Sequence, residues 1–169
     1  NTAEGAPTSN NPFGMSLYQP NYILPFFYTS SPNQDAYASQ ANYPELNKVT
    51  INFQISVKYP LWRINHTNTL NLAYTQMSIW QAYQSAAFFN ETDYEPALFW
   101  AHQVHWPLGH GWDMQFLNTG LVHQSNGEGG TLERSWNRAY VDGMVMRNQW
   151  TLSVEPWYVF QDNTYKEHN

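Results

Sequence analysis

The 169-residue chain contains no cysteine, which excludes disulfides, zinc thiolate sites and thiol nucleophiles together. Basic residues are also scarce. Seven Lys and Arg against 13 Asp and Glu give a formal net charge of -6, and no basic cluster is present that could neutralise several phosphates. Nucleic acid is therefore not expected as a partner.

Long hydrophobic runs are missing as well. No apolar run reaches the roughly eighteen residues of a membrane-spanning helix, and the mean hydropathy is -0.60. A helical membrane protein is thus not expected. A transmembrane β-barrel stays open, because its lipid-facing and lumen-facing residues alternate and average to a polar composition. The aromatic content of 17%, with 8 Trp and 12 Tyr, suits the interfacial girdles of a barrel, although a soluble aromatic-rich β-sandwich has a similar composition.

Alternation of apolar and polar residues predicts an all-β, antiparallel fold. The clearest strand covers 49–62, where Ile51 and Ile55 fall on one face and Asn52 and Gln54 on the other. We expect about seven strands, over residues 21–30, 49–62, 69–80, 94–106, 111–125, 135–146 and 150–159. Residues 1–20 are rich in Asn, Pro, Gly and Ser without periodicity, and we expect them to form an irregular arm.

One predicted hairpin carries residues with catalytic chemistry. His123 and Ser125 are two residues apart, so both point to the same face of a strand. A glycine-rich turn over 126–130 follows, and the returning strand carries Asn137 near its start. A serine needs a base that removes its proton, and the base needs a group that holds its tautomer. A Ser-His-Asn set is one interpretation; a polar strand end before a glycine loop is the other.

Gln76 interrupts the apolar face of its predicted strand. A carboxamide that faces lipid leaves donors and acceptors unsatisfied, at a cost of roughly a few kcal/mol, unless a partner supplies hydrogen bonds. A subunit contact at Gln76 is the first interpretation. A bulge or strand end at this position is the alternative.

Several segments, in this order and at nearly this spacing, resemble those of the bacterial outer membrane phospholipase A family. They are Pro60-Leu61-Trp62-Arg63, Tyr74-Thr75-Gln76, Glu91-Thr92 with Tyr94-Glu95-Pro96, the hairpin from His123 to Arg138, and Pro156-Trp157-Tyr158-Val159. The resemblance implies a twelve-stranded antiparallel transmembrane β-barrel in the outer membrane of a Gram-negative bacterium. It also implies that His123, Ser125 and Asn137 are catalytic. Residues 21–169 would then be the N-terminal portion of a single barrel domain.

The same resemblance implies a calcium ion and a homodimer. In the family, Ca²⁺ lies beside the catalytic serine, held by loop oxygens and by a partner-chain ligand. The positions that match the loop ligands are Glu128 and Glu133, and the partner ligand would come from near Ala86. Carboxylates suit a hard cation, whereas the alternative is that both are solvated loop acids. The dimer contacts would be Gln76, Ile55 and Val57.

The residues together with this resemblance predict a calcium-dependent phospholipase A, a carboxylic ester hydrolase that cleaves acyl ester bonds of outer membrane phospholipids with a Ser-His-Asn triad. The resemblance implies that this enzyme is a homodimer activated by dimerisation. Two alternatives from other classes stay open. One is a catalytically inactive, porin-like or structural outer membrane barrel. The other is a soluble, carbohydrate-binding β-sandwich.

Overall fold

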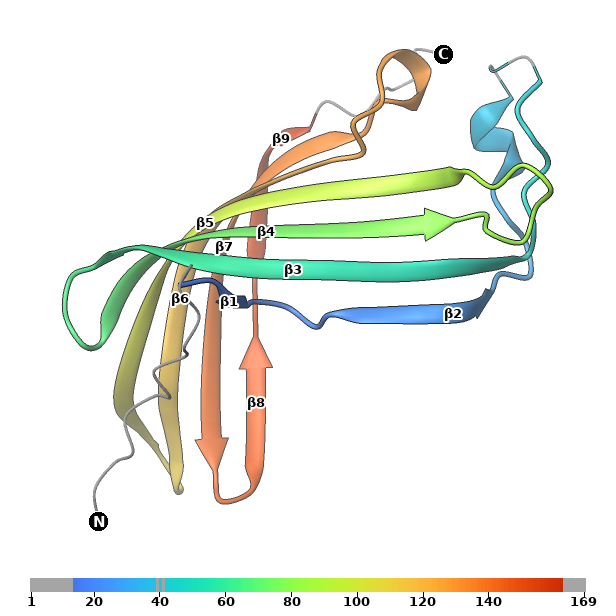
Figure 1. The fold of residues 1–169 in the computed structure, drawn as a ribbon. Helices are drawn as coiled ribbons and strands as arrows, with labels where there is room; N and C mark the ends of the chain where they lie inside the picture. Colours follow the sequence, from blue (N-terminus) through green and yellow to red (C-terminus); the bar gives the residue numbers. More distant parts are fainter. Residues whose placement is uncertain (1–13, 39, 41, 163–169) are drawn as a thin grey trace.

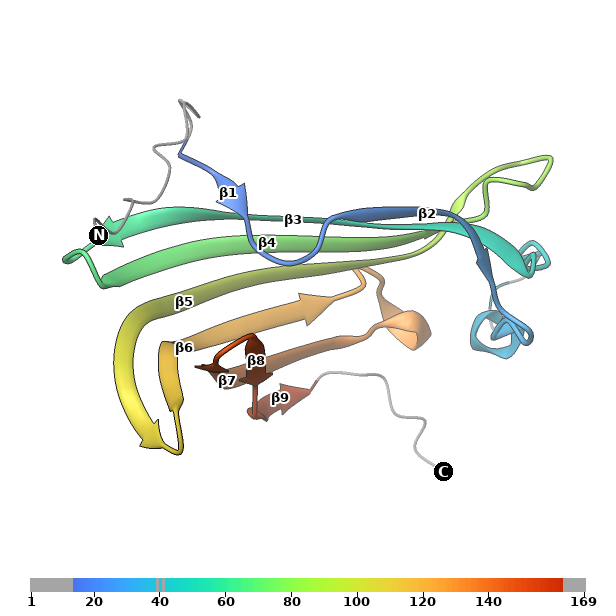
Figure 2. The same ribbon diagram turned by 90° about the horizontal axis from the view of Figure 1, so that it is seen from below.

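The computed structural model describes residues 14–38, 40 and 42–162. These residues form one nine-stranded sheet in which every strand pair is antiparallel. The sheet curls like part of a barrel wall (Figures 1 and 2). The predicted all-β antiparallel fold is confirmed. The alternative of a β-sandwich is wrong, because the strands belong to one curved sheet rather than to two facing sheets.

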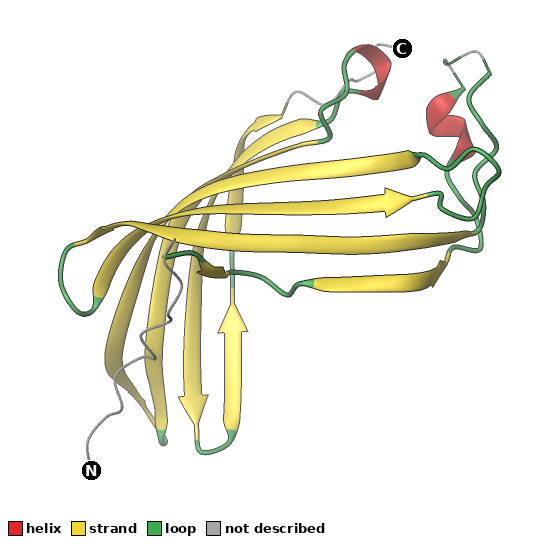
Figure 3. Cartoon of the chain, in the orientation of Figure 1, coloured by secondary structure: helices red, strands yellow, loops and turns green. Residues whose placement is uncertain are grey.

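Most of the described residues lie in strands, and loops connect one strand to the next (Figure 3). They are β1 Ser16–Leu17, β2 Tyr22–Tyr28, β3 Val49–Arg63, β4 Asn68–Trp80, β5 Phe89–Gly109, β6 Trp112–Ser125, β7 Ser135–Arg147, β8 Trp150–Val154 and β9 Trp157–Asp162. Two 3-10 turns, η1 Gln34–Tyr37 and η2 Gly130–Leu132, complete the set. Neither of these described helices is long and apolar enough to cross a membrane.

The order across the sheet is β1-β3-β4-β5-β6-β7-β8, with β2 also paired to β3 and β9 also paired to β7. Strands β3 to β7 therefore lie side by side in chain order, joined by hairpins. This arrangement places β5, β6 and β7 next to one another. The predicted catalytic hairpin is β6–β7, beside the edge of the sheet that β8 and β9 form.

Two differences from the predicted strands have local causes. The single strand predicted over 150–159 is split into β8 and β9, because Pro156 has no N–H for a ladder hydrogen bond; its carbonyl instead accepts from the Val141 N–H at 3.1 Å. Within the predicted irregular arm, Ser16 and Leu17 pair with Lys58 and Val57 of β3. Residues 1–13 of that arm lie outside the described residues.

The two faces of the sheet differ as the alternation predicts. The concave face holds the buried side chains: Ser56, Ala73, Thr75, Ala97, Phe99, Val122 and Tyr140. The convex face carries exposed apolar residues, among them Ile55, Tyr59, Leu72, Leu98 and Leu121. An apolar outer face on a curved antiparallel sheet is typical of the lipid-facing wall of a membrane barrel.

The segment between β1 and β2 covers part of the concave face. The Tyr18 ring stacks on Phe99, with centroids 5.0 Å apart, and its hydroxyl lies 3.1 Å from the Tyr140 hydroxyl. The Gln19 N–H donates to Ser56 Oγ at 3.1 Å. These contacts join residues far apart in the sequence, so the segment packs against the inner side of the wall that carries the hairpin.

Candidate active site

The β6–β7 register brings His123 and Asn137 together. The two residues are directly opposite partners, and opposite partners in an antiparallel pair share a face. His123 Nδ1 and Asn137 Oδ1 lie 2.8 Å apart. With Nδ1–H as the donor, Nε2 of the imidazole is left as an acceptor, which is the tautomer a general base requires. The contact lies on the exposed, convex face.

Ser125 lies on the same face, at the end of β6. It is half-buried and directly opposite both Tyr94 of β5 and Ser135 of β7. Of the three predicted catalytic residues, all described, only His123 and Asn137 are joined by a hydrogen bond; none links the Ser125 hydroxyl to the ring. Such bonds are often long in the absence of substrate and tighten in the complex. The arrangement thus offers an oriented imidazole with a hydroxyl further along the same strand face.

Asn137 has a second partner that the sequence analysis did not find. Its Nδ2 donates to Gln161 Oε1 of β9 at 2.9 Å. Strict alternation along the strand predicted over 150–159 does not place Gln161 beside Asn137. A bulge in β9 is responsible, since the register shifts between Asn137 and Arg138.

Asn126 organises the loop that follows Ser125. Its side chain is 7% exposed. Nδ2 donates to the Leu132 carbonyl at 2.8 Å, and Oδ1 accepts from the N–H groups of Glu128 at 3.3 Å and Arg134 at 3.1 Å. A single side chain thereby holds both ends of the loop. The Asn-Gly pair in the sequence signalled a turn, but not these contacts.

The predicted calcium ligands lie on this loop. Glu128 is exposed and Glu133 is half-buried, while Ala86 is exposed in the connection between β4 and β5. Carboxylate and backbone carbonyl oxygens are the ligands that Ca²⁺ prefers, so the loop offers suitable donors. Among the described residues, no group of three or more His, Cys, Asp or Glu is gathered that could hold a metal ion. The roles of Glu128, Glu133 and a partner ligand near Ala86 stay predictions.

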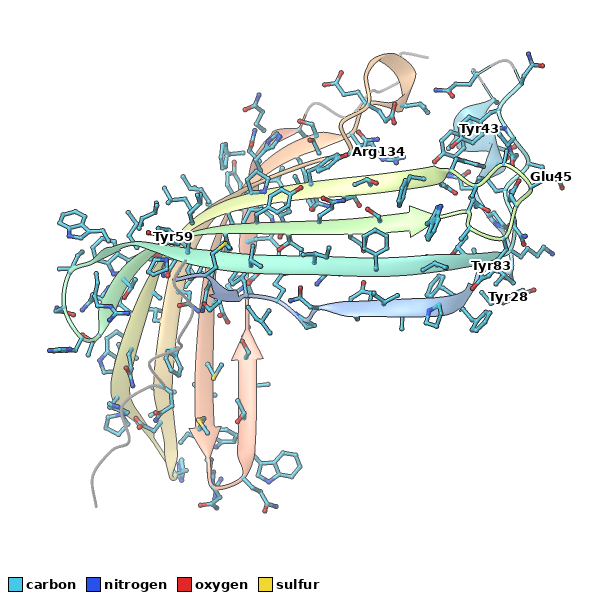
Figure 4. The ribbon with its side chains drawn as sticks, in the orientation of Figure 1. Tyr28, Tyr43, Glu45, Tyr59, Tyr83 and Arg134 are labelled. Atoms are coloured by element: carbon cyan, nitrogen blue, oxygen red, sulfur yellow. The ribbon has the colours of Figure 1, made fainter. Side chains whose placement is uncertain are left out.

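Two ion pairs connect β5 to β7 and to the loop residue that precedes β7. Arg134, labelled in Figure 4, pairs with Glu91 at the end of the loop. Arg138 Nη2 donates to Glu95 Oε2 at 2.7 Å on the concave side, and both of these side chains are less than a fifth exposed. The strand with Asn137 is therefore held from behind by a charged, hydrogen-bonded contact.

An aromatic cluster lies outside the strands, beside the same loop. Tyr37 of η1 stacks on Tyr43 with centroids 4.1 Å apart, and its hydroxyl donates to the Asn90 carbonyl at 3.0 Å. Burial, with a smaller contribution from Tyr37, raises the pKa of Tyr43 to about 12; the negative charge of Glu128 adds to the shift. The cluster therefore stays neutral at physiological pH, and it lines one pocket together with Glu128 and Arg134.

A shallow groove on the convex face adjoins the histidine and asparagine. Besides His123, Asn137 and Gln161, its lining is mostly apolar and includes Leu72, Pro96, Leu98, Leu121 and Phe160. An alkyl chain laid here would contact carbon on one side and reach the imidazole at one end. The groove thus couples the polar site to a hydrophobic surface.

Gln76 has hydrogen-bond partners within its own chain. The expectation that its amide would be unsatisfied without a partner chain is therefore wrong. Its Oε1 accepts from the Tyr74 hydroxyl at 3.0 Å, and its Nε2 donates to Ser78 Oγ at 3.3 Å. Among the described residues no partner takes its second N–H or the second lone pair of its oxygen, so both could bond to another chain. Gln76 lies opposite Ile55 on one side and Tyr94 on the other, and Tyr94 is opposite Ser125. The predicted contact and the predicted nucleophile therefore share one row of the sheet.

Comparison with known proteins shows the family of the chain. The family model for phospholipase A1 matches residues 2–169. Phospholipase A1 of Proteus vulgaris is 38% identical over 159 residues, which is 92% of this chain and 54% of that protein. Phospholipase A1 of Escherichia coli K12 is 36% identical over 154 residues, or 89% of this chain and 53% of that protein. The chain thus spans about half the length of these curated relatives.

Solved structures of outer membrane phospholipases have the same fold as this chain. The outer membrane phospholipase dimer of Salmonella typhi with bound calcium superposes with a TM-score of 0.82 at 36% identity, over 89% of this chain and 60% of that chain. Outer membrane phospholipase A of Escherichia coli also gives 0.82 at 36% identity, over 90% and 64%. The predicted barrel architecture and outer membrane location are confirmed by these relatives. The chain belongs to the phospholipase A1 family.

Proposed function

We propose that this chain carries the active site of a calcium-dependent phospholipase A, which hydrolyses acyl ester bonds of outer membrane phospholipids. The contact between His123 Nδ1 and Asn137 Oδ1 at 2.8 Å, on the convex face and in line with Ser125, supports this function most directly. An oriented imidazole on a lipid-facing surface has an obvious use only if the substrate is itself in the membrane. The name of the family, phospholipase A1, denotes the hydrolysis of phospholipids.

In the proposed reaction, Ser125 Oγ attacks the ester carbonyl while His123 Nε2 takes the hydroxyl proton. The ester C–O bond then breaks, and the imidazolium returns the proton to the departing lysophospholipid oxygen. A water molecule hydrolyses the acyl-enzyme by the same route and releases a fatty acid. Asn137 holds the ring through Nδ1; being neutral, it stabilises the imidazolium less than a carboxylate would.

The negative charge that develops on the carbonyl oxygen needs donors. The backbone N–H of Ser125 is one candidate. Glu128 and Glu133 would hold the calcium ion, with a ligand from the partner near Ala86. When bound, Ca²⁺ would supply positive charge beside the oxyanion. The Salmonella typhi relative is a dimer with bound calcium, which supports a role for calcium in this proposal.

Dimerisation is the second part of the proposal. Ile55 is 52% exposed and lies directly opposite Gln76, and Val57 continues the same face. A second copy placed against this row would lie two strands from Ser125. It would thereby enclose a substrate chain beside the nucleophile and bring its own loop near Ala86 to the calcium ligands.

Replacement of Ser125 by Ala tests the function. Phospholipid hydrolysis in mixed micelles with calcium should fall by at least about 10³-fold, while calcium binding and folding are retained. Ser135→Ala, at the opposite position on β7, is the matched control and should keep most of the activity. Unchanged hydrolysis in the Ser125 variant would reject the triad and favour the alternative of an inactive, structural barrel.

A further inference from the structure

A bulge in β9 turns Gln161 toward the proposed catalytic asparagine. Val159 lies opposite Arg138, but Gln161, not Phe160, lies opposite Asn137. Phe160 is the extra residue. Without it, the alternation would place Phe160 beside Asn137 and turn Gln161 to the concave side. Bulges near active sites commonly re-aim a side chain in this way.

The resulting contact gives the Asn137 amide a partner at each end. An asparagine amide can rotate by half a turn and exchange its oxygen and nitrogen with little change in shape. In the observed orientation Oδ1 faces His123 Nδ1 at 2.8 Å and Nδ2 donates to Gln161 Oε1 at 2.9 Å. In the reverse orientation an N–H would face Nδ1, which favours the tautomer with its proton on Nε2. That tautomer cannot accept a proton from serine.

We propose that Gln161 is a positioning residue: as an acceptor for Asn137 Nδ2, it keeps Oδ1 toward His123 and so holds the imidazole in its basic tautomer. The inference rests on the proposed function and deepens it, because it extends the Ser-His-Asn set to a fourth residue on another strand. Gln161 lies at the rim of the convex groove and acts through Asn137 rather than on the substrate.

Two substitutions separate positioning from packing. Gln161→Leu keeps the approximate volume but removes the acceptor. Its kcat should fall by about tenfold, the usual effect of losing one such hydrogen bond, while KM stays within about twofold. Gln161→Glu keeps an acceptor oxygen and cannot donate, so it should keep kcat within about twofold of the parent. Gln149→Leu, in the exposed β7–β8 turn, is the control and should match the parent.

A spectroscopic readout accompanies the kinetics. Nitrogen-15 NMR of the His123 ring, identified by its loss in His123→Ala, should report the Nδ1–H tautomer in the parent and in Gln161→Glu, and a mixture of tautomers in Gln161→Leu. Parent-like kcat and tautomer in Gln161→Leu would overturn the inference. Equal impairment in the Leu and Glu variants would also overturn it, because packing would then be the cause.

Failure of this inference and failure of the proposed function give different results. The Ser125→Ala protein is assayed beside the Gln161 variants. Loss of activity in Ser125→Ala with no effect of Gln161→Leu rejects only the positioning role. Full activity in Ser125→Ala rejects the proposed function, and with it the role of Gln161.

Discussion

Asn137 is the residue whose contribution the structure defines most closely, because both ends of its amide are engaged. Asn137→Ala should lower kcat by roughly 10- to 100-fold, since the imidazole loses its orienting acceptor but stays next to Ser125. The loss should be smaller than in Ser125→Ala. Steady-state hydrolysis of phospholipid in mixed micelles measures both. A loss as large as that of the serine variant would mean that Asn137 does more than orient the ring.

Asn126 gives a second prediction for a single side chain. Asn126→Ala removes three hydrogen bonds that shape the loop with Glu128 and Glu133, so the proposed ligands should lose their fixed spacing. We expect the calcium concentration for half-maximal activity to rise by about tenfold, equivalent to one or two lost hydrogen bonds. Removal of calcium by a chelator should abolish activity in both proteins. An unchanged calcium requirement would show that this loop does not hold the ion.

The sequence predicted some of these residues and missed others for identifiable reasons. His123 and Asn137 could be paired because alternation and a short hairpin fix which residues share a face. Gln161 could not be found, since a bulge is a one-residue change in register without a distinct pattern. The Asn126 contacts depend on the folded path of the loop. At Gln76 the sequence indicated an unusual polar residue but not its local partners, Tyr74 and Ser78.

In strand β6, Gly120 lies where its neighbours leave no room for a Cβ atom. A Cβ atom there would lie 2.6 Å from Tyr140 Cε1 and 2.7 Å from Phe99 Cβ, both buried on the concave face. Gly120→Ala should therefore lower the free energy of unfolding by about 1–3 kcal/mol through overpacking. Urea titration of the protein in lipid vesicles measures the change.

Gly143 is the matched control on the neighbouring strand. A Cβ atom at Gly143 meets only Met114 Cε, at 3.7 Å, an ordinary contact. Gly143→Ala should thus be neutral or slightly stabilising, because alanine loses less backbone entropy than glycine. Equal effects of the two substitutions would contradict the packing described for β6.

At the scale of the whole molecule, the convex face must meet lipid and, in the proposal, a second copy. Gln76→Leu should weaken the dimer by about threefold, a typical value for one polar contact between chains in a membrane, and lower activity at limiting protein concentration. The effect is modest because two of the amide's contacts are made within the chain. Sedimentation equilibrium in detergent with calcium measures it, with Gln149→Leu as the control. A dimer unaffected by Gln76→Leu would place the interface elsewhere.

The overall architecture could be predicted from the sequence, whereas the contacts on the concave face could not. Alternation in β3 to β7 predicted antiparallel strands with one apolar face, and the family resemblance predicted that these strands form one barrel wall. It did not predict that the segment with Tyr18 lies against the concave face, where it contacts Phe99 and Tyr140. Such contacts depend on the shape of the folded sheet, and the local periodicity of the sequence does not indicate them.

In the proposed function Ser125, activated by His123, is a nucleophile that faces the lipid. Reaction of the protein in phospholipid vesicles with a long-chain alkyl fluorophosphonate, followed by peptide mass spectrometry, tests it most directly. We predict a single adduct on Ser125 that forms much more slowly in His123→Ala and hardly at all with a short, water-soluble analogue. An adduct on another residue, or equal labelling of Ser125 without His123, would contradict the account.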